Sequence, residues 1–251
     1  AVVLVVDVVQ LVLKEVYAMK VRIKYSKSGV LRFIGHLDIM RYFQKAIRRA
    51  DIDIAYSTGY SPHQIISFAA PLSLGITSEG EYFDAELVTF TNSEDIINRL
   101  NEVMVDGITI TDAVLLDENA KNSMSVVAAS DYVISFNEDL AIKDKLIERV
   151  TDYISGEHIL IVKKTKKSEK EVDIKPFIYD LHLEGDKIYM LLATGSVENL
   201  KPALVIEGLY NYVGIEYNKF DYRIHRIEAY MRDEQGELVF LLAAGKKISS
   251  N

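Results

Sequence analysis

The sequence predicts an α+β protein made of two tandem ferredoxin-like domains, each with the element order β-α-β-β-α-β. Two observations lead to this prediction. Runs that alternate apolar and polar residues, typical of strands, are separated by segments with apolar residues at helical spacing. The same order of elements then occurs a second time, without a residue-level repeat between the halves. The predicted division is an N-terminal extension at 1–18, a first domain at 19–118, and a second domain with a C-terminal tail at 119–251.

The composition is that of a globular chain with its own core. Of the 251 residues, 49% are apolar and 26% are charged. The chain has no cysteine, which excludes disulfides, thiolate metal ligands, a cysteine nucleophile and an iron–sulfur cluster held by its own thiolates. We expect a cytoplasmic location, no membrane contact, and no cofactor or metal.

The extension, AVVLVVDVVQLVLKEVYA, differs from the rest of the chain. It precedes MKVRIKY, which resembles a natural start, and polar residues interrupt its valine-rich run. The run is therefore too short and too charged to span a membrane, and it lacks the basic opening and cleavage site of a signal peptide. A strand followed by a helix, a non-native addition, and the tail of an upstream domain remain as interpretations.

The first domain is predicted element by element from its periodicity. Residues 20–26 alternate like a strand, 27–29 turn, and VLRFI at 30–34 extends again. A helix is expected from His36, because the apolar residues that follow share one face. The remaining expected elements are strands at 64–69 and 81–90, a helix capped by Asn92 or Ser93, and a strand at 107–116.

The second domain repeats this order after a linker at 117–130. A strand is expected at 131–136 and a helix at 141–154. The charged segment at 163–171 is predicted to form the tip of a hairpin. The remaining expected elements are strands at 158–165 and 172–194, the latter turning at 184–186, a helix at 196–214 with Pro202 near its start, and a final strand at 220–231.

Positive charge is concentrated in one stretch. The chain carries a net charge of −8, yet residues 20–49 hold nine Lys or Arg and one acid, so that this stretch is +8 and the remainder −16. A basic patch on an acidic body binds phosphate groups locally, and a solvated helix face is the alternative. The expected RNA-binding residues are Lys24, Arg32, Arg41, Lys45, Arg48 and Arg49.

The stretch AYSTGYSPHQIISFAAPLSLG, residues 55–75, collects two of the four prolines and one of the five histidines. Upstream, His36 lies at a predicted helix start, where a neutral imidazole accepts a proton or a hydrogen bond; capping or packing is the alternative. We expect the loop at 56–63 to fold back along the helix, so that both histidines border one polar pocket. The expected pocket residues are His36, Asp38, Tyr56, Ser57, Tyr60, His63, Ser78, Glu81 and Asp84.

Three stretches also resemble a known family. They are KSGVLRFIGHLDIMRYFQKAIRRADIDIAYSTGYSPHQIISFAAPLSLGITSEGEYFD at 27–84, KKTKKSEKEVDIKPFIYDL, and GSVENLKP. They resemble the radical SAM-linked protein family, a bacterial domain encoded beside, or fused to, a radical SAM protein. Members commonly read SHLD for GHLD and NPHP for SPHQ, so this chain departs at Gly35, Ser61 and Gln64. The resemblance covers about residues 20–215, and it implies a bacterial cytoplasm and a radical SAM partner but no transferable activity.

Three functions follow as hypotheses. The first is a non-catalytic module that binds tRNA or rRNA and presents it to a radical SAM enzyme, with Tyr25, Phe33, Tyr60 and Phe68 as aromatic platforms. The second is a docking subunit that binds the radical SAM partner without touching RNA. The third is a metal-independent endoribonuclease in which His36 is the general acid or base and Lys45 or Arg41 stabilises the phosphorane.

Overall fold

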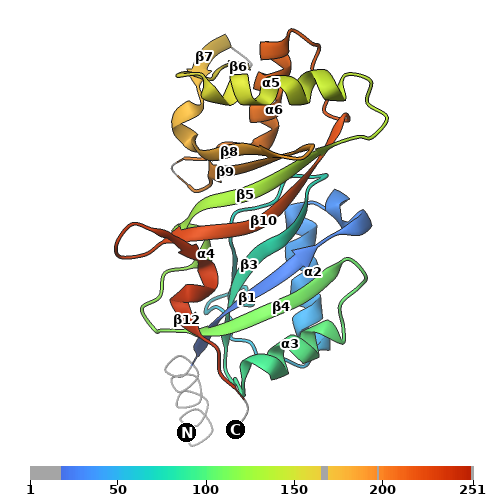
Figure 1. The fold of residues 1–251 in the computed structure, drawn as a ribbon. Helices are drawn as coiled ribbons and strands as arrows, with labels where there is room; N and C mark the ends of the chain where they lie inside the picture. Colours follow the sequence, from blue (N-terminus) through green and yellow to red (C-terminus); the bar gives the residue numbers. More distant parts are fainter. Residues whose placement is uncertain (1–17, 165–168, 197, 250–251) are drawn as a thin grey trace, which may run out of the picture.

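A computed structural model describes residues 18–164, 169–196 and 198–249 (Figure 1). Within them, ten strands form one large mixed sheet and five α-helices, α2 to α6, accompany it. The expected mixture of helices and strands is therefore confirmed. Apart from Ala18, the N-terminal extension predicted at 1–18 lies outside the described residues, as does the centre of the charged tip at 163–171.

The first half of the sheet runs in the order β4-β1-β3, with β2 also paired to β3. All these pairings are antiparallel. Apolar side chains of α2 and α3 pack with those of the strands in one buried cluster. The elements are β1 (Met19–Lys27), the 3-10 helix η1 (Gly29–Phe33), α2 (His36–Arg49), β2 (Ile66–Phe68), β3 (Thr77–Leu87), α3 (Ser93–Asn101) and β4 (Ile108–Leu116).

The second half repeats this pattern in the order β10-β5-β9-β8, again antiparallel. Side chains of α5 and α6 pack with these strands in a second buried cluster. A separate hairpin of β6 and β7 follows α5. The elements are β5 (Val127–Phe136), α5 (Lys143–Ser155), β6 (Leu160–Lys164), β7 (Glu169–Asp173), the 3-10 helix η2 (Lys175–Phe177), β8 (Ile178–Glu184), β9 (Lys187–Ala193), α6 (Pro202–Val213) and β10 (Tyr222–Arg232).

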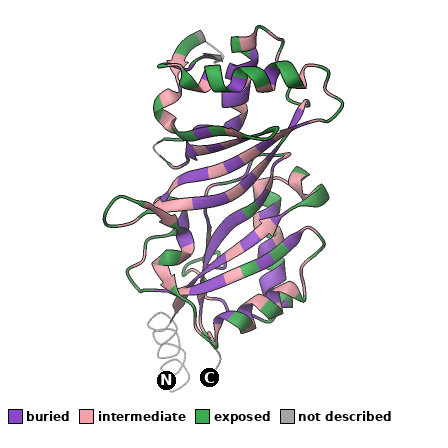
Figure 2. Ribbon diagram, in the orientation of Figure 1, coloured by how far each residue is buried: buried purple, intermediate pink, exposed green. Residues whose placement is uncertain are grey.

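The two halves join along one edge of β3. The C-terminal part of β3 pairs with β2, whereas its first residues pair in parallel with β10, Thr77 opposite His225 and Ser78 opposite Arg226. Strands of both halves are buried where they meet in the middle of the molecule (Figure 2). The sheet is therefore continuous across the junction, which brings residues of both halves into contact.

Four further short elements complete the sheet and its surroundings. They are α4 (Ser123–Val126), β11 (Leu238–Phe240), the 3-10 helix η3 (Leu241–Ala244) and β12 (Gly245–Lys246). The strand β11 pairs with β10, and β12 pairs with β4 at the far edge of the first half. The C-terminal segment thus runs from the second half back across the first.

Several boundaries differ from the sequence prediction. The stretch at 30–34 is not extended but lies largely in η1, which follows Gly29 in the left-handed region. The linker at 117–130 contains α4 and the start of β5, and β10 is not the final strand. The last helix begins at Pro202 rather than at 196, because proline suits the first turn of a helix.

Candidate functional site

The loop at 56–63 is a closed turn with an exposed tip. The backbone N–H of Ser57 donates to the His63 carbonyl at 2.8 Å, and Ser57 Oγ lies 2.8 Å from His63 Nδ1. Tyr56 is half exposed and Tyr60 is fully exposed. The turn therefore holds His63 at a fixed angle while it presents two tyrosines to solvent.

His63 lines a cleft of about 200 Å³ on the sheet face away from α2, here called the β2 cleft. Lys20, Asp84 and Glu86 also line it, together with Gln64. Gln64 is buried, and neither polar atom of its amide has a hydrogen-bond partner among the described residues. The sequence analysis missed Gln64, and a single glutamine beside a histidine carries no signal for it.

His36 lies elsewhere. It begins α2 and packs against the ring of Phe68, with ring centroids 5.7 Å apart at an interplanar angle of 85°. Burial lowers the pKa of His36, the positive charge of Lys27 lowers it further, and Glu81 opposes both. His36 is therefore a partly buried, neutral imidazole beside a group of charged side chains.

Neither of the two clefts described here is lined by both His36 and His63, so their shared pocket stays a prediction. His36 is close to Glu81 in the middle of β3, whereas Ile65, two residues after His63, accepts the backbone N–H of Glu86 near its end. The strand from Glu81 to Glu86 extends about 17 Å at roughly 3.4 Å per residue. His36 lines neither of the two clefts described here. His36 therefore lies near the middle of β3, whereas the loop that carries His63 lies nearer the end of this strand.

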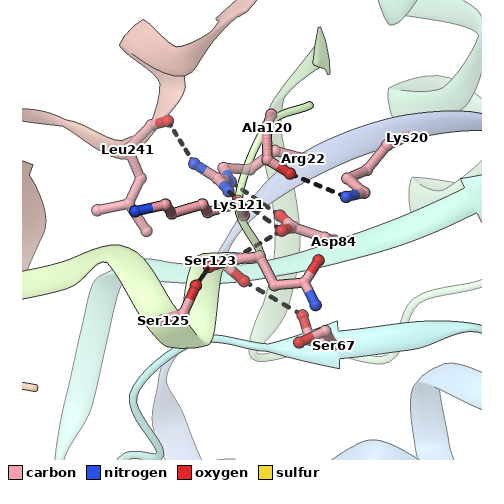
Figure 3. A network of polar contacts seen from close by, with 10 residues as sticks. Lys20, Arg22, Ser67, Asp84, Ala120, Lys121, Ser123, Ser125 and Leu241 are labelled. Atoms are coloured by element: carbon pink, nitrogen blue, oxygen red, sulfur yellow. Dashed lines mark hydrogen bonds and ion pairs between the residues drawn. The ribbon is translucent and has the colours of Figure 1, made fainter. Parts of the chain in front are cut away.

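Asp84 belongs to a buried polar network rather than to a reactive site (Figure 3). Arg22 Nε donates to its Oδ1 at 2.8 Å, Arg22 Nη2 donates to its Oδ2 at 3.1 Å, and the Ser123 backbone N–H donates to Oδ2 at 2.6 Å. Arg22 also donates to the carbonyls of Leu241 and Lys121. Both oxygens of the carboxylate are thus occupied, and the network ties the linker and the C-terminal segment to β1 and β3.

Glu81 and Ser78 lie at the junction of the halves. Glu81 accepts a hydrogen bond from Arg226 Nη1 at 3.0 Å, and this nitrogen also donates to the carbonyl of Ala70 at 3.1 Å. Ser78 Oγ accepts the backbone N–H of Gly80. Both residues are structural in this arrangement, and Glu81 is paired with an arginine that the sequence analysis did not single out.

Asp38, the remaining expected pocket residue, is an exposed partner of Arg41 at 3.3 Å in the first turn of α2. Lys45, Arg48 and Arg49 follow it on the exposed side of the same helix. Among the described residues, none of these three forms an ion pair. The helix therefore presents four cationic side chains to solvent, only one of which is paired with an acid.

The two other expected RNA-binding residues, Lys24 and Arg32, lie outside α2. Lys24 lies on the opposite face of the sheet, where its Nζ is 2.5 Å from Glu228 Oε2, so it cannot act with α2. This is a correction, and its cause is the alternation of side chains along β1. Arg32 lies in η1 with its guanidinium 4.7 Å from the centre of the Phe33 ring.

A second cleft, of about 270 Å³, lies between the halves and is here called the junction cleft. The first half contributes residues 70–76, and the second contributes Thr194, Asn199 and Lys201 at the entry to α6. Arg226 and Tyr132 line it as well. Two of the stretches that carry the family resemblance, from different halves of the sequence, therefore meet at one cleft.

Two general features bear on the chemistry available. In the described ranges, no three or more His, Asp or Glu side chains gather as they would to hold a metal ion. No helix in the described part of the chain is both long and apolar enough to cross a bilayer.

The comparisons with known proteins give a family. The chain belongs to the family described as "Uncharacterized protein conserved in bacteria (DUF2344)", which matches residues 20–202. No match was found among curated proteins. Among solved structures, the chain is similar to one from the "Crystal Structure of a Cbf5-Nop10-Gar1 Complex", with a TM-score of 0.41 and 9% identity over 85% of this chain. The match spans 49% of that chain, about half its length.

Proposed function

We propose that the chain is a non-catalytic, RNA-binding module of two ferredoxin-like domains that serves a radical SAM protein in the bacterial cytoplasm. The repeated strand order and the β-α-β-β-α-β connectivity support the ferredoxin-like assignment. The radical SAM partner rests on the resemblance of residues 27–84 and 195–202. The substrate would be a structured RNA, such as tRNA or rRNA.

The exposed basic side of α2 is the observation that carries RNA binding. Arg41, Lys45, Arg48 and Arg49 lie along one helix in an otherwise acidic chain, and their charges are nearly free of acidic partners among the described residues. Such a row matches the spacing of backbone phosphates better than scattered charges do. The exposed tyrosines at 56 and 60 follow α2 in the chain and offer faces for unpaired bases.

The endoribonuclease alternative has less support. His36 and Lys45 are nine positions apart on one helix, which corresponds to about 13 Å along its axis. His36 is also half covered by Phe68. A base and a charge stabiliser so far apart do not bracket one phosphate, so we favour binding over cleavage.

The docking alternative has an observation in its favour. Val30, Phe33, Leu37 and Leu74 are all more than 60% exposed. The backbone of Gly75 donates to the carbonyl of Arg32, which brings the loop of Leu74 next to η1. Exposed apolar side chains gathered in this way are typical of a protein contact, so the radical SAM partner would dock here whether or not RNA binds α2.

Reversing charge on α2 tests RNA binding. In the R41E/K45E/R48E variant, affinity for bulk bacterial tRNA should fall at least about tenfold, and the slope of log K against log salt should flatten by roughly two, because about 0.7 counterions are released for each lost contact. The measurement is a filter-binding titration at several salt concentrations. The matched control is K145E/R149E/K219E, which makes the same change in net charge at exposed sites of the second half.

The control separates a local effect from a general one. Equal losses in both variants would mean that net charge alone governs binding, and an unchanged slope in the α2 variant would favour docking without RNA. Cleavage of the tRNA during the titration would favour the endoribonuclease.

A further inference from the structure

Three buried charged side chains, one of which lines the junction cleft, carry a net positive charge. Lys27, Glu81 and Arg226 are all more than 90% buried, and they bring two cations and one anion together. Glu81 is paired with Arg226 at 3.0 Å. Lys27 forms no ion pair among the described residues, and its Nζ has only the carbonyl of Ile34 at 3.4 Å.

The pKa shifts are consistent with this arrangement. Burial lowers the pKa of Lys27, Arg226 lowers it further, and Glu81 opposes both. The three groups therefore influence one another across the junction. His36 lies near this group as well. Burial lowers its pKa, so the imidazole is neutral and does not balance the positive charge. A buried excess of positive charge is unfavourable unless an anion accompanies it.

Arg226 connects this charge to the cleft. It lines the junction cleft, its Nε has no hydrogen-bond partner among the described residues, and its guanidinium lies 5.6 Å from the centre of the Tyr132 ring. Only Nη1 is engaged by Glu81 and by the carbonyl of Ala70. The arginine is thus held in place on one side while part of its donor set remains unused.

The rest of the cleft suits an oxyanion. Ser73 supplies a hydroxyl group, Asn199 supplies an amide, and Lys201 supplies a second cation at the entry to α6. The Thr194 hydroxyl also lines the cleft, but it donates to the carbonyl of Leu192 at 3.3 Å. Among the residues that the structure describes, no Asp or Glu lines the cleft. Arginine with hydroxyl and amide donors is the usual set for phosphate, because a guanidinium matches the spacing of its oxygens.

We propose that the junction cleft is a phosphate-binding site in which Arg226 is the principal ligand and Lys27 supplies the balancing charge. The site is separate from α2 and does not depend on RNA binding. The phosphate group comes either from a free phosphorylated metabolite or from RNA.

Two lysines of β1 provide a matched test. Lys27 is buried and is influenced by the charges of Glu81 and Arg226, whereas Lys24 lies on the other face and is paired with Glu228. The full-length chain and the variants K27M and K24M are titrated with inorganic phosphate, and the melting temperature and the apparent Kd are followed. K27M should melt higher than the native chain without phosphate, because it removes a buried unpaired charge, and should bind phosphate roughly fivefold more weakly or worse.

K24M should differ from K27M both in melting temperature and in affinity for phosphate. It leaves Glu228 without its cation, so the variant should melt lower, yet its affinity for phosphate should equal that of the native chain. A second variant, R226M/E81Q, removes the ligand together with its partner, so that neither member of this pair is left buried without the other, while Lys27 stays in place. Its affinity for phosphate should fall at least about tenfold, the loss expected for a charge-assisted hydrogen bond.

The outcomes are distinct. No stabilisation of the native chain by millimolar phosphate, or equal affinity in the native chain, K27M and R226M/E81Q, would overturn the proposal. If phosphate binds and tRNA competes with it, the phosphate group comes from RNA; if it binds without competition, the source is a free metabolite. R41E/K45E/R48E should retain phosphate binding, so this site and the α2 surface can fail independently.

Discussion

At the scale of single residues, buried ion pairs replace the reactive acids that the sequence suggested. Asp84 and Glu81 each have an arginine partner, and the two partners lie 62 and 145 positions away in the chain. A carboxylate fully engaged in this way orders the chain around it rather than exchanging protons with a substrate. The substitution of Asp84, whose two oxygens are both occupied, therefore tests stability.

Replacing Asp84 by Asn should destabilise the fold. The substitution keeps the shape but removes the charge, and it leaves Arg22 buried without a counter-ion, so we expect a loss of about 3–5 kcal/mol in the free energy of unfolding. Urea denaturation followed by circular dichroism measures this. Asp38→Asn breaks an exposed pair and should cost less than about 1 kcal/mol. Similar losses in both variants would show that Arg22 is not isolated from water.

His36 makes a predictable contribution to pH dependence. Its pKa in the folded chain is below the usual value of about 6.5, so below that pH the unfolded chain binds the proton more readily. The stabilisation is present above pH 6.5 and is lost as the pH falls toward the folded pKa, below which the loss levels off.

The measurement is urea denaturation between pH 7.5 and 5.5, comparing the native chain with His36→Gln. The native chain should lose more stability than the variant over this range. The other four histidines, His63, His158, His182 and His225, are present in both proteins, so their titration cancels in the difference. Parallel curves would mean that the imidazole is as accessible to protons in the folded chain as in the unfolded one.

At the scale of elements, periodicity and capping predicted the long elements. Strand β1 and helix α2 appear where alternation and helical spacing indicate them, and the Asn92 side chain caps α3 by accepting from the Asp95 N–H at 2.8 Å. These signals are local, because each arises from a residue and its neighbours within two turns of helix or a few positions of strand.

Short elements escaped prediction because distant partners define them. The strands β11 and β12 contain three and two residues, too few to show a period, and they form because β10 and β4 offer free edges. In η1 the β-branched and aromatic residues suggested a strand, yet Val30 and Phe33 are exposed. A local propensity for strand is overridden where no sheet edge is within reach.

The candidate site was predicted in its parts but not in its assembly. The exposed basic residues of α2 follow from helical spacing alone. The register of β2 against β3 decides where the loop with His63 lies relative to His36, and no local signal in the sequence reveals that register. Arg226, the main residue of the junction cleft, lies in a strand whose sequence gives no hint of its partner Glu81.

At the scale of the whole molecule, the two halves are held together by a narrow seam. Among the described residues, the backbones of β3 and β10 pair at two positions, Thr77 with His225 and Ser78 with Arg226. Around them, Glu228 accepts from Lys24 and from the Tyr82 hydroxyl, and Glu81 accepts from Arg226. The seam is thus polar on both faces of the sheet, and its strands must approach closely for these bonds to form.

Gly80 permits that approach, and replacing it by Ala should weaken the seam. A Cβ at this position would lie 2.5 Å from the Glu228 Cα and 2.8 Å from its Oε1, and the backbone cannot move aside as a flexible side chain would. We expect a loss of about 1–3 kcal/mol in the free energy of unfolding, the usual cost of overpacking. Gly35→Ala is the matched control, since a Cβ there meets nothing within 4 Å, and it should cost less than about 1 kcal/mol as a change of N-cap.

Hydrogen exchange locates the effect: in G80A the amides near Thr77 and His225 should exchange faster, while those in the buried clusters of each half keep their protection. Uniform loss of protection would show that the halves unfold as one unit, and unchanged stability would show that β3 and β10 can separate without cost.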